Sequence, residues 1–356
     1  MAVELGKLVS EVKETIELSD ISNRKIAVDA YNTIYQFLSI IRQPDGMPLV
    51  DSKGNVTSHL SGILYRTINL LEYGITPVFV FDGMPPLLKR RTLEARAMRR
   101  ESALKEWEKA KALGNVEEAR AHAMASTKIN KEIVASSKDL LRYMGIPFIQ
   151  APSEGEAQAA SLCGRGLVYA SASQDYDSFL FGADIVIRNL AISGRRKLPG
   201  KNIYINVNTE RISLKKLLEN LSISREQLIL LGMLMGTDFN AGIEKVGPKT
   251  ALKIVKEHRT LDDVVGYVKE RYGTEFDSDP REVMDLFANP EVDKISEGEF
   301  SKLVSEPKPD KDSIVKFMCF LFTVFCINIT LVSTSSYLCL FGPLCPLAHI
   351  ACLQPL

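Results

Sequence analysis

Residues 151–181 read APSEGEAQAASLCGRGLVYASASQDYDSFLF and place four carboxylates in two tight pairs. Glu154 and Glu156 follow a Pro-Ser dipeptide that favours a helix start, and Asp175 and Asp177 follow an apolar run that is typical of a strand. Carboxylates that converge from separate elements suit Mg²⁺, which takes oxygen ligands at about 2.0–2.1 Å and keeps several waters. The stretch therefore predicts a site for divalent metal ions.

Other apolar runs also stop on an acid. KIAVDA ends at Asp29 and VFVFDG at Asp82, and Asp238 follows the apolar start of LMGTDFN. Ligands of open α/β sheets collect at the carboxyl ends of the strands, where these acids would lie. Such a concentration of negative charge is costly unless cations neutralise it. The candidate metal ligands are Asp29, Asp82, Glu154, Glu156, Asp175, Asp177 and Asp238.

Some of these acids also have simpler interpretations. Ser153 and Glu156 match the S-x-x-E capping box, in which Glu156 would only satisfy backbone donors at a helix start. Asp29 and Asp82 would equally serve as turn residues or helix N-caps after strands. The repetition of acids after apolar runs favours the metal site.

The order of the predicted elements indicates an α/β fold with a mostly parallel central sheet flanked by helices. Residues 6–23 are amphipathic and predict a partly helical lead into a buried strand at 25–28, and TPVFVFDG at 76–83 predicts a second strand. Helices are expected over 31–41 and 58–73, and further strands at 145–150 and in VYASAS and DIVIRNL. ISGRRKLPGKNIYINV predicts a hairpin whose turn carries Arg195, Arg196, Lys197 and Lys201.

A charged, Ala-rich segment from Pro85 to Met144 predicts an inserted helical arm with a break near Gly114 and Asn115. We expect Trp107, the only tryptophan, to pack within this arm. The chain is neutral overall, with 44 basic and 44 acidic residues, but the start of the arm is basic. A basic cluster beside metal-binding acids suits an enzyme that acts on phosphodiesters; a solvated helix face is the alternative. The cluster contains Lys89, Arg90, Arg91, Arg96, Arg99 and Arg100.

The later part of the chain predicts a second DNA contact. SREQLILLGMLMGTDFN is typical of a helix followed by a loop, and a Gly-rich turn over 246–248 opens a helix at Lys249. Backbone N–H groups at such a helix start bind phosphates.

Five of the six cysteines lie between Cys319 and Cys352, so the body of the chain is typical of a reduced intracellular protein. The first residues, MAVELGKLVSEVKET, contain no apolar secretory signal, and we expect a cytoplasmic protein.

The chain resembles the flap endonucleases, most closely the archaeal members, over residues 1 to about 318. The resemblance rests on VDAYNTIYQFLS, TSHLSGILYRTINLLE, PVFVFDGMPP, QAPSEGEAQAA, YASASQDYDSFLFGA, GTDFN and GIEKVGPKTALKI, in this order and spacing. It implies structure-specific cleavage of 5′ flaps in Okazaki-fragment maturation and repair, with 5′-3′ exonuclease activity. The implied partner is branched DNA near the nucleoid, and no small-molecule substrate is expected.

The resemblance also implies two Mg²⁺ ions and a role for each acid. Asp82, Glu154 and Glu156 match the ligands of the first ion, with Asp29 acting largely through water. The matching ligands of the second ion are Asp175, Asp177 and Asp238.

Two basic residues of the arm, Lys89 and Arg96, are one heptad apart and match the family pair that reaches the scissile phosphate. Tyr35 matches a tyrosine that stacks on a base beside the cut; a core tyrosine is the alternative interpretation. The turn over 246–248 resembles a helix-two-turn-helix element that grips duplex DNA and binds K⁺. The implied DNA contacts are Tyr35, Arg42, Arg66, Glu154, Gly236, Asp238, Gly247 and Lys249.

The resemblance divides the chain into five regions. Residues 1–100 are the N-terminal nuclease region with the start of a helical arch, and 101–144 are the remainder of the arch and cap. Residues 145–258 are the internal nuclease region with the helix-two-turn-helix, 259–318 are a C-terminal helical wrap, and 319–356 are an atypical uncharged tail.

The sequence departs from the family pattern at Ala2, where a glycine is usual, at Lys245, where a glycine commonly precedes the turn, and in the tail. FMCFLFTVFCINITLVSTSSYLCLFGPLCPLAHIACLQPL, residues 317–356, has no Asp, Glu, Lys or Arg and no match to the sliding-clamp peptide that the family implies. A shifted reading frame after Cys319 would explain the change. A membrane anchor is less favoured because the apolar run of 317–332 is short of the about 20 residues that a span needs. The cysteine spacing also lacks a CxxC metal pattern.

Two functions of other classes fit part of the pattern. A non-catalytic binder of DNA junctions would be expected to lack some of the acids, and all seven are present. A phosphatase that uses Asp175 and Asp177 as a DxD pair would form a phosphoenzyme, but it leaves Glu154, Glu156 and Asp238 without a role.

Overall fold

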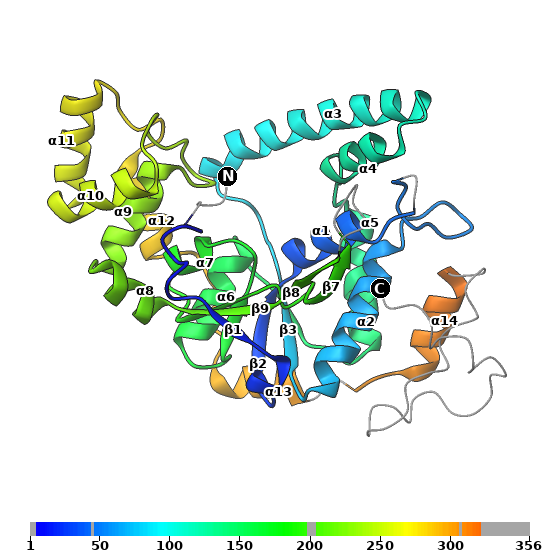
Figure 1. Cartoon of the computed structure of the whole chain (residues 1–356). Helices are drawn as coiled ribbons and strands as arrows, with labels where there is room; N and C mark the ends of the chain where they lie inside the picture. The colour runs from blue at the N-terminus through cyan, green and yellow to red at the C-terminus, as the bar shows by residue number, and fades with distance from the viewer. Residues whose placement is uncertain (1–4, 44–45, 198–203, 306–307, 322–356) are drawn as a thin grey trace.

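The computed structural model describes residues 5–43, 46–197, 204–305 and 308–321. Its centre is a seven-stranded sheet in the order β1-β9-β6-β5-β2-β3-β4, and β7 and β8 form a separate hairpin (Figure 1). The strands of the sheet are β1 (Glu14–Ile16), β2 (Lys25–Asp29), β3 (Thr76–Phe81), β4 (Phe148–Gln150), β5 (Ala170–Ala172), β6 (Ile185–Arg188) and β9 (Thr209–Ser213), and those of the hairpin are β7 (Gly194–Lys197) and β8 (Tyr204–Val207).

The middle of the sheet is parallel, which confirms the predicted fold class. Strands β4, β3, β2, β5 and β6 pair in parallel, and β9 and β1 add an antiparallel edge. Asp29 is the last residue of β2 and lies opposite Val80 of β3. Because parallel strands end at the same edge, Asp29, Asp82 and the loop after β5 are brought to one side of the molecule.

Successive side chains of β2 point to opposite faces of the sheet, and both faces are buried. Ile26 and Val28 pack with the helices α1 (Ala30–Ile40), α2 (Ser58–Glu72), α5 (Lys131–Tyr143) and α14 (Lys311–Leu321). Ala27 faces the other way, toward α6 (Gly155–Gly164) and Phe300 of α13 (Glu297–Ser305). Side chains of successive strand residues point to opposite faces, so an unbroken apolar strand requires a helical layer on each side.

A second core lies among the helices that follow β9. It is formed by α8 (Leu214–Leu221), α9 (Arg225–Met235), α10 (Pro248–Glu257), α11 (Leu261–Tyr272) and α12 (Pro280–Ala288) together with α7 (Asp177–Leu180). Three aromatic rings, those of Phe181, Phe239 and Phe287, contact one another at centroid distances of 4.9–6.4 Å. Phe239 directly follows Asp238, so this aromatic cluster fixes the loop that carries that acid.

The predicted arm consists of the 3-10 turn η2 (Leu87–Lys89) and two helices, α3 (Arg90–Ala112) and α4 (Val116–Ala125). It ends earlier than predicted, because α5, the last helix before Met144, packs in the core beside α2. The break at Gly114 and Asn115 is confirmed: Gly114 has φ +72° and the Asn115 side chain caps α4. Figure 1 shows α3 running above the sheet, between the α9–α12 helices and the α1 and α5 helices. Trp107 is half-buried beside Lys111, whose ammonium lies 5.5 Å from the ring centroid, as expected of a packing residue.

Other predicted elements differ from the structure in places. Residues 6–23 were predicted to be partly helical, but the helical part is only the 3-10 turn η1 (Leu18–Ile21), and Glu14–Ile16 form the edge strand β1. The hairpin is confirmed at β7 and β8, but Arg195, Arg196 and Lys197 belong to β7 and not to the turn. Lys201 lies outside the described residues, as do Ala2 and residues 322–356 of the tail. No helix within the described ranges is long and apolar enough to cross a membrane.

Candidate active site

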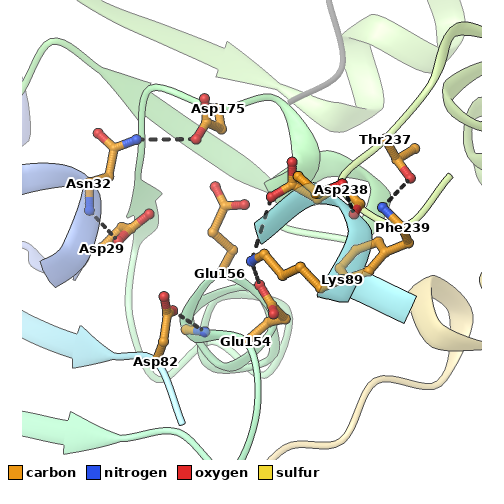
Figure 2. Close-up of polar contacts among 12 residues, drawn as sticks. Asp29, Asn32, Asp82, Lys89, Glu154, Glu156, Asp175, Thr237, Asp238 and Phe239 are labelled. Carbon is orange, nitrogen blue, oxygen red and sulfur yellow. Dashed lines mark hydrogen bonds and ion pairs between the residues drawn. The ribbon is translucent and has the colours of Figure 1, made fainter. Parts of the chain in front are cut away.

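The acids predicted from the sequence lie around one space at the carboxyl edge of the sheet. Figure 2 shows Asp29, Asp82, Glu154, Glu156, Asp175 and Asp238 arranged about it, although Asp29 and Asp238 are 209 residues apart in the sequence. Asp177, the first residue of α7, is also buried, and its charge acts on Glu156. The structure therefore brings together the acids that the sequence analysis selected.

Two of the acids are held by helix starts. Asp29 caps α1, because one of its oxygens accepts a hydrogen bond from the Asn32 backbone N–H at 2.9 Å. Asp82 accepts from the Gly155 N–H at 2.8 Å, at the first residue of α6. A Cβ on Gly155 would lie 2.6 Å from Asp82 Oδ1, so only glycine allows this approach. The N-cap interpretation of Asp29 is therefore confirmed, and its carboxylate also lies beside the other candidate acids.

The capping-box interpretation of Ser153 and Glu156 is wrong. The N-cap of α6 is Glu154, and no side-chain cap bond is made there. Glu156 instead accepts from Ser173 Oγ at 2.7 Å and from Ser178 Oγ at 3.1 Å. Its carboxylate therefore faces the site and not the backbone of its own helix.

Burial raises the pKa of most of these carboxyls, because a charged oxygen loses its hydration there. Burial, followed by the negative charge of Asp82, raises the pKa of Asp29 well above its usual range. Burial and the charges of Asp175 and Asp177 raise the pKa of Glu156 in the same way. The pKa values of Asp82, Glu154 and Asp175 are raised as well, with burial as the largest cause.

Two cations of the arm enter this acidic space. Lys89 forms ion pairs with Glu154 and, at 3.5 Å, with Asp238, and Arg96 Nη2 lies 2.7 Å from Asp238 Oδ1. Burial alone would raise the pKa of Asp238, but the charges of Arg96 and Lys89 outweigh burial and lower it. Burial would lower the pKa of Lys89, yet Glu154 and Asp238 raise it, so its ammonium is charged. Lys89 and Arg96, which are one heptad apart in the sequence, thus both contact Asp238.

The donor set suits a hard divalent cation. All seven predicted ligands present carboxylate oxygens, and two cationic side chains offset only part of their charge. Within the described ranges, no three His, Cys, Asp or Glu side chains are close enough to bind one ion directly. Mg²⁺ commonly uses one or two carboxylates and keeps its waters, so the arrangement fits Mg²⁺ better than an ion that needs a closed protein cage.

The comparisons with known proteins agree with this geometry. The XPG N-terminal domain family matches residues 1–103, and the XPG I-region family matches residues 145–238. Flap endonuclease 1 of Methanosarcina barkeri is 52% identical over 319 residues, which is 90% of each chain. The chain belongs to the flap endonuclease family. Flap endonuclease 1 of Methanocella arvoryzae is 60% identical over 258 residues, 72% of this chain and 75% of that one.

A solved structure supports the same assignment. The flap endonuclease-1 of Methanococcus jannaschii superposes with a TM-score of 0.66 at 35% sequence identity, covering 89% of this chain and 92% of that one. The catalytic core of Rad2 in complex with a DNA substrate gives a TM-score of 0.62 at 25% identity, covering 91% and 95% of the two chains. The flap endonuclease fold therefore extends over nearly all described residues.

The residues expected to contact DNA in a flap endonuclease lie in different environments. Tyr35 is 43% exposed on α1, so the core interpretation of this tyrosine is wrong. Arg42 donates to the Leu38 carbonyl at 2.8 Å and to the Gly46 carbonyl at 2.7 Å. Arg66 donates to the Leu190 carbonyl at 2.6 Å, and burial lowers its pKa to about 10. Both arginines are held by protein groups, whereas the ring of Tyr35 is accessible.

The segment expected to form a helix-two-turn-helix covers the end of α9 and the start of α10. Gly236 ends α9 with φ +96°, and a Cβ there would lie 2.7 Å from the Ala241 carbonyl oxygen. Gly247 is the N-cap of α10 and has open space around it, and Lys249 is in the first turn of this helix. Lys245 has φ +68°, a left-handed conformation that favours glycine. The family glycine at this position therefore has a conformational reason.

Sequence reasoning missed several polar residues of the site. Asn32 contacts Asp29 and Asp175, and Ser173 and Ser178 contact Glu156. Thr92 of α3 donates to the Asp238 backbone carbonyl at 2.8 Å. Isolated Asn, Ser and Thr residues form no periodic sequence pattern that would predict a role in a site. Only their place beside the acids, as in YASASQDYDS, could have identified them as site residues.

Proposed function

We propose that this protein is a structure-specific 5′-flap endonuclease with 5′-3′ exonuclease activity, which acts on branched DNA in Okazaki-fragment maturation and repair. One observation carries the proposal: the basic start of the arm closes directly onto the acidic site through Lys89 and Arg96. An enzyme that cleaves phosphodiesters needs both kinds of charge, since cations attract the DNA backbone and acids bind the metal ions that activate the phosphate. Relatives named flap endonuclease 1 cover 90% of the chain.

We assign two Mg²⁺ ions to the acids. Asp82, Glu154 and Glu156 would hold the first ion, in part through its bound waters, with Asp29 acting largely through water. Bound ions supply Lewis acidity and neutralise charge on the reacting phosphate oxygens. The second ion would be held by Asp175, Asp177 and Asp238, again in part through bound waters.

The residues of the chain have the following roles in this proposal. Lys89 and Arg96 place positive charge beside Asp238, where the scissile phosphate would gain negative charge in the transition state. Burial of the site excludes bulk water, which strengthens these interactions. The exposed ring of Tyr35 lies on the same helix that Asp29 caps and would stack on a base beside the cut, a contact that contributes about 1–3 kcal/mol.

Contacts outside the site would position the duplex. Gly247 and Lys249 at the start of α10 offer backbone N–H groups and one positive charge to phosphates, with a K⁺ ion at the adjoining turn. Arg42, Arg66 and Gly236 would hold DNA-facing loops in place. Since residues 319–356 contain no clamp-binding peptide, we expect weak or absent stimulation by a sliding clamp, and efficient capture of the clamp would contradict this expectation.

The test is the Asp177→Ala variant, assayed on a 5′-flap duplex under single turnover with excess enzyme. Loss of one ligand should lower the cleavage rate by about 10³-fold or more while DNA affinity stays within about twofold, because transition-state interactions are lost and phosphate contacts are kept. Asp139→Ala removes a surface acid that pairs with Arg142 and is the matched control. Cleavage by Asp177→Ala at the control's rate would show that the assignment of the site is wrong.

A further inference from the structure

Asn32 connects two acids that are assigned to different ions. Its backbone N–H donates to Asp29 Oδ1 at 2.9 Å, and its side-chain Nδ2 donates to Asp175 Oδ2 at 3.2 Å. Asp29 ends β2 and Asp175 follows β5, so one residue of α1 spans two strand ends. Figure 2 shows Asn32 between these carboxylates, with both contacts drawn.

The orientation of the Asn32 amide is fixed by chemistry. An ionised carboxylate only accepts hydrogen bonds, so the NH₂ group of Asn32 must face Asp175 and its carbonyl must face away. That carbonyl accepts a hydrogen bond from Nε2 of Gln36, one turn further along α1. Gln36 therefore fixes the side-chain orientation of Asn32, and Asn32 in turn fixes that of Asp175.

The arrangement is not explained by the needs of the helix. Asn32 occupies the third position of α1, where a side chain can reach back to the N-cap, yet it turns to the loop that carries Asp175. Among the described residues, the buried Gln36 Oε1 has no hydrogen-bond partner. The hydrogen bonds from Gln36 to Asn32 and from Asn32 to Asp175 thus leave a buried acceptor unpaired, which is unfavourable for folding. Arrangements that cost stability in this way are expected at functional sites.

The carboxylates of Asp29 and Asp175 repel each other when both are charged, and the hydrogen bonds of Asn32 to both keep them close together. Without the hydrogen bond from Asn32, this repulsion would favour rotation of Asp175 away from the site when ions are scarce. The amide of Asn32 holds Asp175 in its inward-facing orientation before an ion arrives.

Resting on the proposed function, we propose that Asn32 is a positioning residue that holds Asp175 in the ion-binding orientation, with Gln36 setting its amide. Asn32 itself touches neither ion nor DNA in this role. Its loss should therefore weaken ion binding and leave DNA binding unchanged, which distinguishes it from a residue that contacts the substrate.

The test measures ion binding directly, in the DNA-free protein. Titration calorimetry with Mn²⁺ should show binding about 10-fold weaker in Asn32→Ala than in the wild type. The Mg²⁺ concentration for half-maximal cleavage should rise by a similar factor, and saturating Mg²⁺ should restore most of the rate. Gln36→Ala should shift both values in the same direction by about threefold, since it removes only the orienting contact.

Asn220→Ala is the matched control, because Asn220 Nδ2 also donates to a carboxylate, that of Glu11 at 3.1 Å, on the exposed surface. Its ion affinity should equal that of the wild type. Wild-type Mn²⁺ affinity in Asn32→Ala would overturn the proposal, as would a loss of ion binding matched by an equal loss of DNA binding. If the wild type binds Mn²⁺ but does not cut flaps, the proposed function fails, and the calorimetric comparison still decides the role of Asn32.

Discussion

Arg96 Nη2 donates to both carboxylate oxygens of Asp238, at 2.7 and 2.9 Å. Thr92, one turn earlier on α3, donates to the backbone carbonyl of the same residue. The arm is thus attached to the loop after α9 by a side-chain contact and a backbone contact. Because Asp238 also pairs with Lys89, the position of the arm and the charge of the site are coupled.

Removing the guanidinium should slow cleavage more than it weakens binding. For Arg96→Ala we expect a single-turnover rate about 10²–10³-fold lower, since a charge that acts on the transition state is lost. DNA affinity should fall by about threefold at most, because Arg96 is only one of six cations at the start of the arm. Arg99→Ala, an exposed residue of the same helix, is the control. An equal effect of the two variants on the rate would contradict the specific role of Arg96.

Gly155→Ala tests the close approach of α6 to Asp82. The added Cβ would lie 2.6 Å from Asp82 Oδ1, so the carboxylate has to move and its bond to the Gly155 N–H is strained. We expect a cleavage rate about 10–100-fold lower, because misplacement by about 1 Å costs about 10²-fold. Gly298→Ala, where no atom lies within 4 Å of the new Cβ, should leave the rate unchanged. Normal cleavage by Gly155→Ala, measured in Mg²⁺ titrations, would mean that Asp82 is not a ligand.

His59 should make the protein sensitive to mild acid. Its ring is buried between α2 and α5 with Nε2 2.8 Å from Ser136 Oγ, and burial lowers its pKa from 6.5 to about 4. When folding lowers the pKa of a group, stability is lost as pH falls from the group's pKa in the unfolded state toward its pKa in the folded state. Between pH 7 and pH 5 this amounts to about 2 kcal/mol of unfolding free energy.

The measurement is denaturant unfolding at pH 7 and pH 5 for the wild type and His59→Gln. The raised carboxyl pKa values contribute equally to both proteins, so the difference in pH dependence isolates His59. His258→Gln, in which a ring that stacks on Tyr267 at 4.3 Å is lost, is the control. Identical pH dependence of the wild type and His59→Gln would show that His59 does not titrate in this way.

Lys245→Gly should stabilise the fold. Lys245 has φ +68°, and a left-handed conformation costs a residue with a Cβ about 1–2 kcal/mol. The greater freedom of glycine in the unfolded chain offsets about 0.4–1 kcal/mol of this, so a net gain of about 0.5–1 kcal/mol is expected from thermal unfolding. Asn189→Gly, at φ +61°, should gain less because asparagine tolerates this region. Destabilisation by Lys245→Gly would mean that the lysine side chain makes a favourable contact that outweighs the strain.

Part of the site could be predicted because Asp29 and Asp82 lie at the ends of buried strands. KIAVDA and VFVFDG are apolar on both faces, which indicates parallel strands, and parallel strands end at one edge. The strands β1 and β9 were not predicted, since ETI and TERIS are short and polar. The edge strand β1 pairs with β9, across 190 residues or more of sequence, and β9 pairs with β6 on its other side. Local patterns cannot reveal a pairing that depends on such a distant partner.

The secondary contacts of the site were less predictable than its acids. Thr92 and Asn32 act through one hydroxyl and one amide, whose partners are set by how α3 and α1 dock on the sheet. The S-x-x-E motif at Ser153 was misleading because the helix begins one residue later than the motif requires. These outcomes depend on tertiary packing, which overrides the local preference.

The central claim is that acids from distant segments bind two divalent ions in one place. The most direct measurement is a crystal structure of the protein grown with Mn²⁺, examined for anomalous scattering at the manganese edge. We predict two peaks about 3.5–4 Å apart, one nearest Asp82, Glu154 and Glu156 and the other nearest Asp175, Asp177 and Asp238. Absence of anomalous peaks among these carboxylates at saturating Mn²⁺ would contradict the account.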